Sequence, residues 1–158
     1  MKTSSTLCLS ALIAISLCSL SACNILFGEE IARLEIKELS VEGTYHEDST
    51  TVQLKEGDEI TIWTDVDLEY EGEVDYLFKA YIESPGKKKT YFTIYPEERS
   101  TTVGEVTTSF NNHTSTKYQG KAETVVITEG GTYTLRGYFI TDSPDVLTVN
   151  KSDLVIKK

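Results

Sequence analysis

A run of carboxylates between residues 65 and 75 is the part of this sequence best placed to bind an ion. Asp65, Asp67 and Glu69 alternate along the chain, and more acidic residues follow as far as Asp75. Alternate residues of a β-strand share a face, so these three would present their oxygens together. Oxygen-rich sites suit Ca²⁺, which takes roughly six to eight such ligands. The run lacks the fixed ligand spacing and Gly of a known calcium loop, so it predicts a solvated acidic edge that discourages strand-to-strand aggregation, with no cofactor; a calcium site at Asp65, Asp67 and Glu69 is the open alternative.

Four aromatic residues form a second candidate site. Strand alternation points Tyr81, Tyr91 and Tyr95 away from the side that would bury Phe78. Trp63 points outward by the same reasoning on its own strand. Exposed Tyr and Trp are contact residues at protein interfaces and on sugar-binding platforms. We therefore take these four as a candidate binding surface; the alternative is that Tyr is simply a good strand former and that a loop covers the Trp.

The sequence offers little for catalysis. Its two histidines, His46 and His113, lie in polar stretches, and neither has a His or Cys at zinc-ligand spacing. There is no Gly-x-Ser-x-Gly elbow and no Gly-rich phosphate loop. The net charge of −10 argues against nucleic acid, which rewards Lys and Arg. We expect a protein that is not an enzyme and binds no nucleic acid; a hydrolase using a carboxylate pair is the open alternative.

Strands are the elements that must position these residues. Apolar and polar residues alternate in segments that predict strands at 33–37, 52–54, 60–68, 74–82, 90–95, 106–110, 122–127, 132–140 and 154–156. Turn sequences separate several of them, and residues 111–121 are polar enough to predict a loop. This spacing predicts an all-β, antiparallel sandwich of about seven to nine strands, with a jelly roll or small barrel as the alternative.

The N-terminal segment has the layout of a secretory signal peptide. Lys2 precedes an apolar run over 7–20, which is too short for a bilayer-spanning helix. The segment closes on Leu20-Ser21-Ala22-Cys23. This ending resembles the lipobox of bacterial lipoproteins, where signal peptidase II cuts before the Cys and the Cys becomes lipidated. The resemblance implies that Cys23 is the lipidated first residue of the mature chain.

The same resemblance implies a division of the chain into a signal peptide at 1–22, a lipidated tether at 23–30 and a sandwich domain at 31–158. Asn24 is not the Asp that retains enterobacterial lipoproteins in the inner membrane. The implied location is therefore the outer membrane of the cell envelope, facing either the periplasm or the outside. Membrane contact is expected through the lipid on Cys23.

A short pattern near the C-terminal end points to the kind of sandwich. Glu129-x-Gly131-x-Tyr133-x-Leu135 resembles the corner before strand F of immunoglobulin-like domains, in which the Tyr hydroxyl reaches back to upstream backbone. Leu135 stands where that family has a Cys, which implies aliphatic packing in place of an inter-sheet disulfide. The resemblance implies an immunoglobulin-like or fibronectin-type fold and carries no function with it.

Together these features favour a lipid-anchored, non-catalytic binding or accessory domain of the bacterial envelope. It would present a sandwich surface to a protein or a glycan. The alternative is a periplasmic inhibitor or immunity protein that neutralises a basic hydrolase, because the chain is acidic and charge complementarity steers such pairs together.

Overall fold

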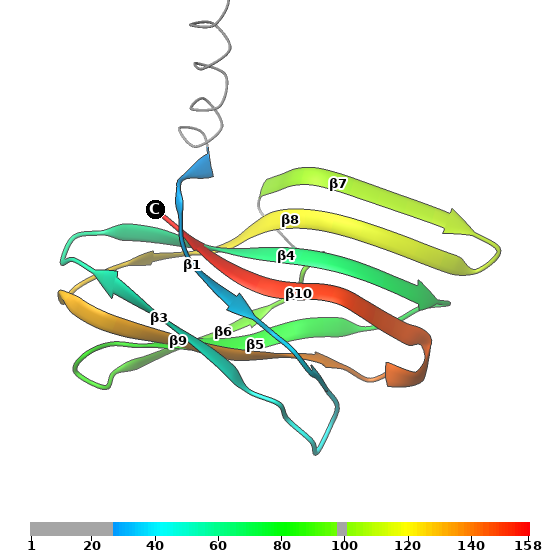
Figure 1. Cartoon of the computed structure of the whole chain (residues 1–158), viewed down its shortest axis with the longest axis horizontal. Helices are drawn as coiled ribbons and strands as arrows, with labels where there is room; N and C mark the ends of the chain where they lie inside the picture. The colour runs from blue at the N-terminus through cyan, green and yellow to red at the C-terminus, as the bar shows by residue number, and fades with distance from the viewer. Residues whose placement is uncertain (1–26, 98–100) are drawn as a thin grey trace, which may run out of the picture.

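The structure is a computed structural model that describes residues 27–97 and 101–158. These residues fold almost wholly into β-strands, which form two packed sheets (Figure 1). The predicted all-β sandwich is therefore confirmed. The proposed signal peptide and Cys23 lie outside the described residues. In the part of the chain that is described, we find no helix long and apolar enough to cross a membrane.

Sheet A, the upper layer of Figure 1, has the strand order β1-β10-β4-β8-β7. Its strands are β1 (Glu30–Glu35), β4 (Glu59–Glu71), β7 (Thr101–Phe110), β8 (His113–Val126) and β10 (Leu147–Lys157). Sheet B has the order β2-β9-β5-β6, and β3 also pairs with β9. Its strands are β2 (Leu39–Ser40), β3 (Asp48–Leu54), β5 (Tyr76–Glu83), β6 (Lys89–Ile94) and β9 (Gly131–Thr141). A 3-10 turn, η1 (Pro144–Val146), precedes β10.

The described residues form ten strands, one above the predicted range. Among the ten strands of the described residues, β2 and β9 form a short parallel pair, and the other pairings are antiparallel. The core lies between the sheets, where the predicted alternation holds: Ile62 and Leu68 of β4 face Phe78 and Phe139 of sheet B, and all four are fully buried. Burying one such side chain contributes about 1.5–3 kcal/mol.

The immunoglobulin-type corner is present. The Tyr133 hydroxyl donates a hydrogen bond of 2.8 Å to the Glu129 carbonyl oxygen, as the sequence resemblance predicted. Gly131 has a φ of +148°, and a Cβ added there would lie 2.6 Å from the Pro85 ring. Only Gly fits this position, because the Pro85 hairpin packs directly on it. Leu135, at the position of the family's Cys, is fully buried by apolar neighbours.

The strand order departs from the immunoglobulin arrangement. In that arrangement the last strand lies beside strand F, in the same sheet. Here β9 has the corner of strand F, but the last strand, β10, lies between β1 and β4 in the opposite sheet. The place beside β9 is taken by β2 and β3. The corner resemblance therefore identifies a local structure, and the path of the last strand is this chain's own.

Tyr133→Phe tests the energetic weight of the corner. The hydroxyl is part-buried and bonded to backbone, so we expect the free energy of unfolding to fall by about 1 kcal/mol, the net value of one hydrogen bond. Urea denaturation followed by circular dichroism measures it, with Tyr91→Phe as the matched control because Tyr91 is exposed. An equal effect of the two variants would show that the corner bond contributes nothing.

The predicted loop at 111–121 is wrong. Most of this segment belongs to β8, which pairs with β7 across a two-residue turn at Asn111 and Asn112. Both turn residues have positive φ, 48° and 67°, as in a type I′ hairpin, which Asn tolerates. Hydroxyl pairs such as Thr107–Thr116, at 2.9 Å, join the strands. The segment looked like a loop because its strand residues are Ser and Thr, which pair across strands as well as populating loops.

Residues 27–30, the last part of the predicted tether, are packed on the sandwich. The ring of Phe27 lies edge-on to Trp63, with centroids 6.1 Å apart. Glu29 exchanges two backbone hydrogen bonds with Lys158, of 2.8 and 2.9 Å. Glu30 already belongs to β1. Phe27 is therefore already part of the packed body of the protein.

Candidate functional site

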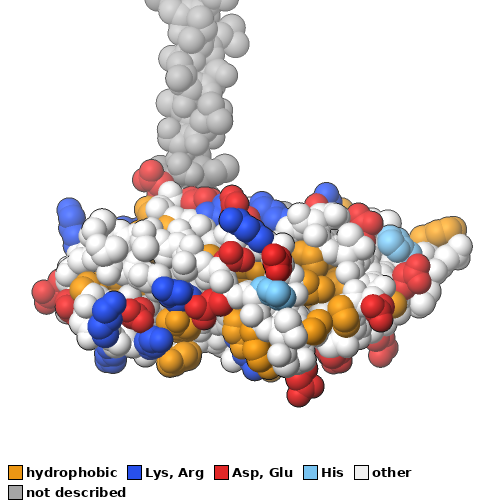
Figure 2. All heavy atoms as spheres, turned by 60° about the horizontal axis from the view of Figure 1, so that its bottom comes forward, with side chains coloured by type: hydrophobic (Ala, Val, Ile, Leu, Met, Phe, Trp, Pro, Cys, Tyr) orange, Lys and Arg blue, Asp and Glu red, His pale blue; other side chains and the backbone are white. Residues whose placement is uncertain are grey.

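The outer face of sheet B carries three of the predicted aromatic residues. Tyr81 extends from β5, and Tyr91 lies on β6 while Tyr95 lies just beyond its end. Tyr91 is 70% exposed and Tyr95 is 49% exposed, so their outward direction is confirmed. Figure 2 turns this side of the molecule toward the viewer, and hydrophobic side chains gather across it among acidic and basic ones.

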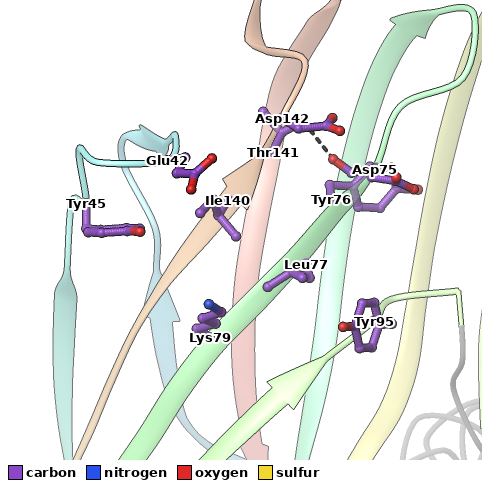
Figure 3. A pocket seen from close by; sticks show the side chains of 10 residues that line it. All are labelled: Glu42, Tyr45, Asp75, Tyr76, Leu77, Lys79, Tyr95, Ile140, Thr141 and Asp142. Carbon is purple, nitrogen blue, oxygen red and sulfur yellow. Dashed lines mark hydrogen bonds between the residues drawn. The ribbon is translucent and has the colours of Figure 1, made fainter.

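A groove of about 460 Å³ hollows this face (Figure 3). Leu77 of β5 and Ile140 of β9, which are direct partners in the sheet, form its apolar floor. Tyr45 and Tyr95 stand on opposite sides of that floor. The ring centroids of Tyr45 and Tyr138 are 5.1 Å apart, and this packing holds Tyr45 in place at its side of the groove. The groove is thus an apolar strip with two aromatic walls on a hydrogen-bonded sheet.

Charged side chains divide the groove into two ends. Glu42, Asp75 and Asp142 line one end, and Lys79 lies at the other (Figure 3). Within residues 27–97 and 101–158, none of these four side chains forms an ion pair. The groove is not among the sites that the sequence predicts, although Leu77 and Ile140 carry a signal: both are apolar residues at positions where strand alternation points outward.

The acidic end is held in place by local hydrogen bonds. The Thr141 hydroxyl donates to the backbone oxygen of Asp75 at 2.8 Å, which ties the loop before β5 to the end of β9. The Ser143 hydroxyl donates to the Asp142 carboxylate at 2.8 Å. Glu42 sits in a tight turn in which Val41 and Thr44 exchange two backbone hydrogen bonds of 3.0 Å. The three carboxylates therefore come from three separate segments that the fold brings together.

Tyr81 and Tyr91 lie next to the groove on the same face. They are cross-strand partners, and their rings are 5.3 Å apart. The Lys89 ammonium lies 4.3 Å from the centre of the Tyr81 ring, so Tyr81 is partly covered and Tyr91 remains open. Of the predicted aromatic set, Tyr95 is the member that lines the groove itself.

Trp63 does not belong to this surface. It points away from the core, as predicted, but from sheet A, and it is only 3% exposed. Phe27 covers one part of the indole, and the Lys157 ammonium lies 4.3 Å above its ring. The indole N–H donates to the Thr61 hydroxyl at 2.9 Å. The prediction of an exposed Trp63 is therefore wrong, because the segment just before β1 folds over it.

The carboxylates of the candidate calcium site share the outer face of sheet A. Asp65 accepts hydrogen bonds from Arg33 and Lys151, Asp67 pairs with Lys117 at 2.6 Å, and Glu69 accepts one from Asn150 at 3.1 Å. In the described part of the chain, no group of three or more His, Cys, Asp or Glu residues is arranged to hold a metal ion. The geometry thus gives these acidic side chains basic and amide partners where a calcium site would require a free oxygen cluster.

Arg33 is the centre of this charged network. Its guanidinium donates to Asp65 at 2.8 Å and to Asp153 at 2.7 Å, two carboxylates that face each other across β4 and β10. Burial opposes ionisation of Asp65, but hydrogen bonds from Lys151 and Arg33 outweigh it and lower its pKa below the usual value. For Asp153, burial prevails over the bond from Arg33 and raises the pKa. The network therefore links the strands β1, β4 and β10 through their side chains.

The two histidines lie apart from the groove lining. His46 Nδ1 lies 2.8 Å from Glu38, and His113 Nε2 lies 3.9 Å from Glu69 on sheet A. An imidazole activates a nucleophile by accepting a hydrogen bond from a hydroxyl or thiol. In the described residues neither imidazole has such a partner. The groove is therefore the feature of this structure best suited to bind a ligand.

Comparison with protein-family models and with curated proteins finds no match for this chain.

Proposed function

We infer that this protein is a lipid-anchored, non-catalytic binding or accessory domain of the bacterial cell envelope, which presents the outer face of sheet B to a protein or glycan. The observation that carries this proposal is the groove between Tyr45 and Tyr95, with its apolar floor of Leu77 and Ile140. Binding sites typically combine an apolar surface with a few placed polar groups. Exposed Tyr is enriched among the residues that dominate binding energy.

The groove is built for binding at low entropic cost. Its floor lies on the paired strands β5 and β9, and hydrogen bonds fix the loops of its acidic end. A site that is already ordered loses less conformational freedom when a ligand arrives. This favours a recognition surface over a flexible loop that happens to be concave.

The position of the proposed lipid anchor also supports the outer face of sheet B as the binding face. Cys23 and Phe27 are four residue steps apart, a span of at most about 14 Å for an extended chain. Phe27 is packed on Trp63, on the outer side of sheet A. A lipid on Cys23 would therefore hold sheet A near the membrane, and the groove on the opposite sheet would face away from it, toward a partner.

A second candidate function is a periplasmic inhibitor or immunity protein that neutralises a basic hydrolase. The observation that favours it is the set of unpaired carboxylates at one end of the groove, Glu42, Asp75 and Asp142. A pull-down against basic cell-wall lytic enzymes, followed by an activity assay, separates an inhibitor from a domain that binds without inhibiting.

Site-specific photo-crosslinking in living cells tests the binding face. We expect benzoylphenylalanine at position 95, on the groove wall, to form adducts with a protein or glycan, because a bound partner would contact this position. The matched control is the same probe at position 110, since Phe110 is also an exposed aromatic, 74% exposed, but lies on sheet A. Adducts are detected by a mass shift on blots. Equal adducts at the two positions, or none at 95, would contradict the proposal.

A further inference from the structure

We propose that the groove of sheet B binds a basic segment of a partner protein, with a Lys or Arg side chain lying along its apolar floor and ending among Glu42, Asp75 and Asp142. This inference rests on the proposed binding function and names the ligand class of that site. It follows from the charges of the groove, its aromatic walls and the position of Lys79.

The unpaired state of the acidic end is the first argument. Other acidic side chains of this surface have basic partners in the structure: Glu83 pairs with Lys87 at 2.9 Å, and Glu47 pairs with Arg136 at 3.2 Å. Among the described residues, the carboxylates of Glu42, Asp75 and Asp142 have no such partner. Charges arranged in this way attract a complementary group, and the group they fit is a cation.

The shape of the groove restricts which cation fits. No cluster of acidic side chains among the described residues is close enough to hold a metal ion. The floor of Leu77 and Ile140 leads toward the acidic end (Figure 3). The long aliphatic stems of Lys and Arg cover apolar surface while their charged ends stay in polar surroundings. The apolar floor therefore matches the aliphatic stem of such a side chain, and the carboxylates match its charged end.

The two aromatic walls of the groove, and the Lys79 end opposite the carboxylates, favour a peptide over a sugar as the ligand. Tyr45 and Tyr95 offer ring faces on which neighbouring apolar or cationic side chains can pack. Lys79, at the opposite end from the carboxylates, can donate hydrogen bonds to the backbone carbonyls of the same segment. A neutral glycan would use the Tyr rings and could hydrogen-bond to both charged ends through its hydroxyls, but it would bring no positive charge to the carboxylates.

Nuclear magnetic resonance titration of the full mature chain in detergent micelles tests this assignment. The probes are acetyl-Lys-Leu-Lys-Leu-amide, acetyl-Glu-Leu-Glu-Leu-amide and chitotetraose. We expect the cationic peptide to shift the signals of Leu77, Lys79 and Ile140 with saturation. In the triple variant Glu42→Gln/Asp75→Asn/Asp142→Asn, its affinity should fall about tenfold or more, since charge-assisted hydrogen bonds are lost.

The matched control is Glu56→Gln/Glu71→Gln/Glu129→Gln, which removes the same charge from exposed side chains outside the groove. We expect it to change the affinity by less than about twofold, because these side chains do not line the groove and salt screens exposed charges. Equal loss in the two triple variants would show diffuse attraction and overturn the inference.

Two other outcomes would also overturn it. Shifts in the groove with chitotetraose or the acidic peptide, but not with the cationic peptide, would refute the ligand class while leaving the binding face established by crosslinking at position 95. Absence of shifts with all three probes would refute the cationic-segment assignment. Thermal melts of both triple variants, expected to match the parent because these side chains are exposed, show that any loss arises from the groove.

Discussion

Trp63→Ala is expected to lower the free energy of unfolding by about 3–5 kcal/mol, the usual cost of truncating a buried Trp. The side chain is 3% exposed, its N–H is bonded to the Thr61 hydroxyl, and Phe27 and Lys157 pack on its ring. The substitution removes all of these contacts and leaves Phe27 without its partner. Chemical denaturation of the purified protein measures the change.

The matched control is Tyr91→Ala. Tyr91 is also a strand residue that points away from the core, but it is 70% exposed. Exposed substitutions of this kind change stability by about 0.5 kcal/mol or less. If both variants melted like the parent, Trp63 would be an accessible contact residue after all, and the packing of Phe27 on it would contribute nothing to the stability of the fold.

Cys23→Ser is expected to abolish membrane anchoring completely. The prediction rests on Leu20-Ser21-Ala22-Cys23, the lipobox-like ending whose Cys we propose to be the site of lipidation. Stable anchoring takes more than one acyl chain. Replacing Cys23, the proposed attachment site, would remove all of these chains at once. The wild type should partition into the detergent phase and incorporate a fatty-acid probe, whereas the variant should do neither.

Cys18→Ser provides the control for this experiment. Cys18 lies within the apolar run of the proposed signal peptide and would be removed with it, so its replacement should leave both labelling and partitioning unchanged. A fatty-acid label that persists in Cys23→Ser, or that disappears in Cys18→Ser, would refute the lipobox assignment.

Local alternation determined most of the sandwich. Leu34, Val52, Ile60 and Phe78 are apolar positions of the period-two patterns that predict their strands, and all four are buried. The corner at Tyr133 was also predictable, because its hydroxyl bonds to a residue only four positions earlier. Such features depend on φ, ψ and side-chain direction within one strand or turn, which nearby residues control.

Alternation also determined which way the aromatic residues point, and tertiary structure alone decided whether they are exposed. Trp63 and Tyr91 both point outward, yet only Tyr91 meets solvent, because the segment at Phe27 folds back over the indole. Strand direction is a local property, whereas cover comes from residues distant in sequence.

The fates of the carboxylates were likewise set by distant partners. Asp65 is neutralised by Arg33 of β1 and Lys151 of β10, which reach it because β10 lies between β1 and β4. Glu42 follows β2 and Asp142 follows β9, and the two residues meet at the groove because these strands pair with each other. Spacing along one strand could place acidic side chains on a common face, but strand order decided which of them found a cation, since ion pairing requires contact within a few ångströms across the fold.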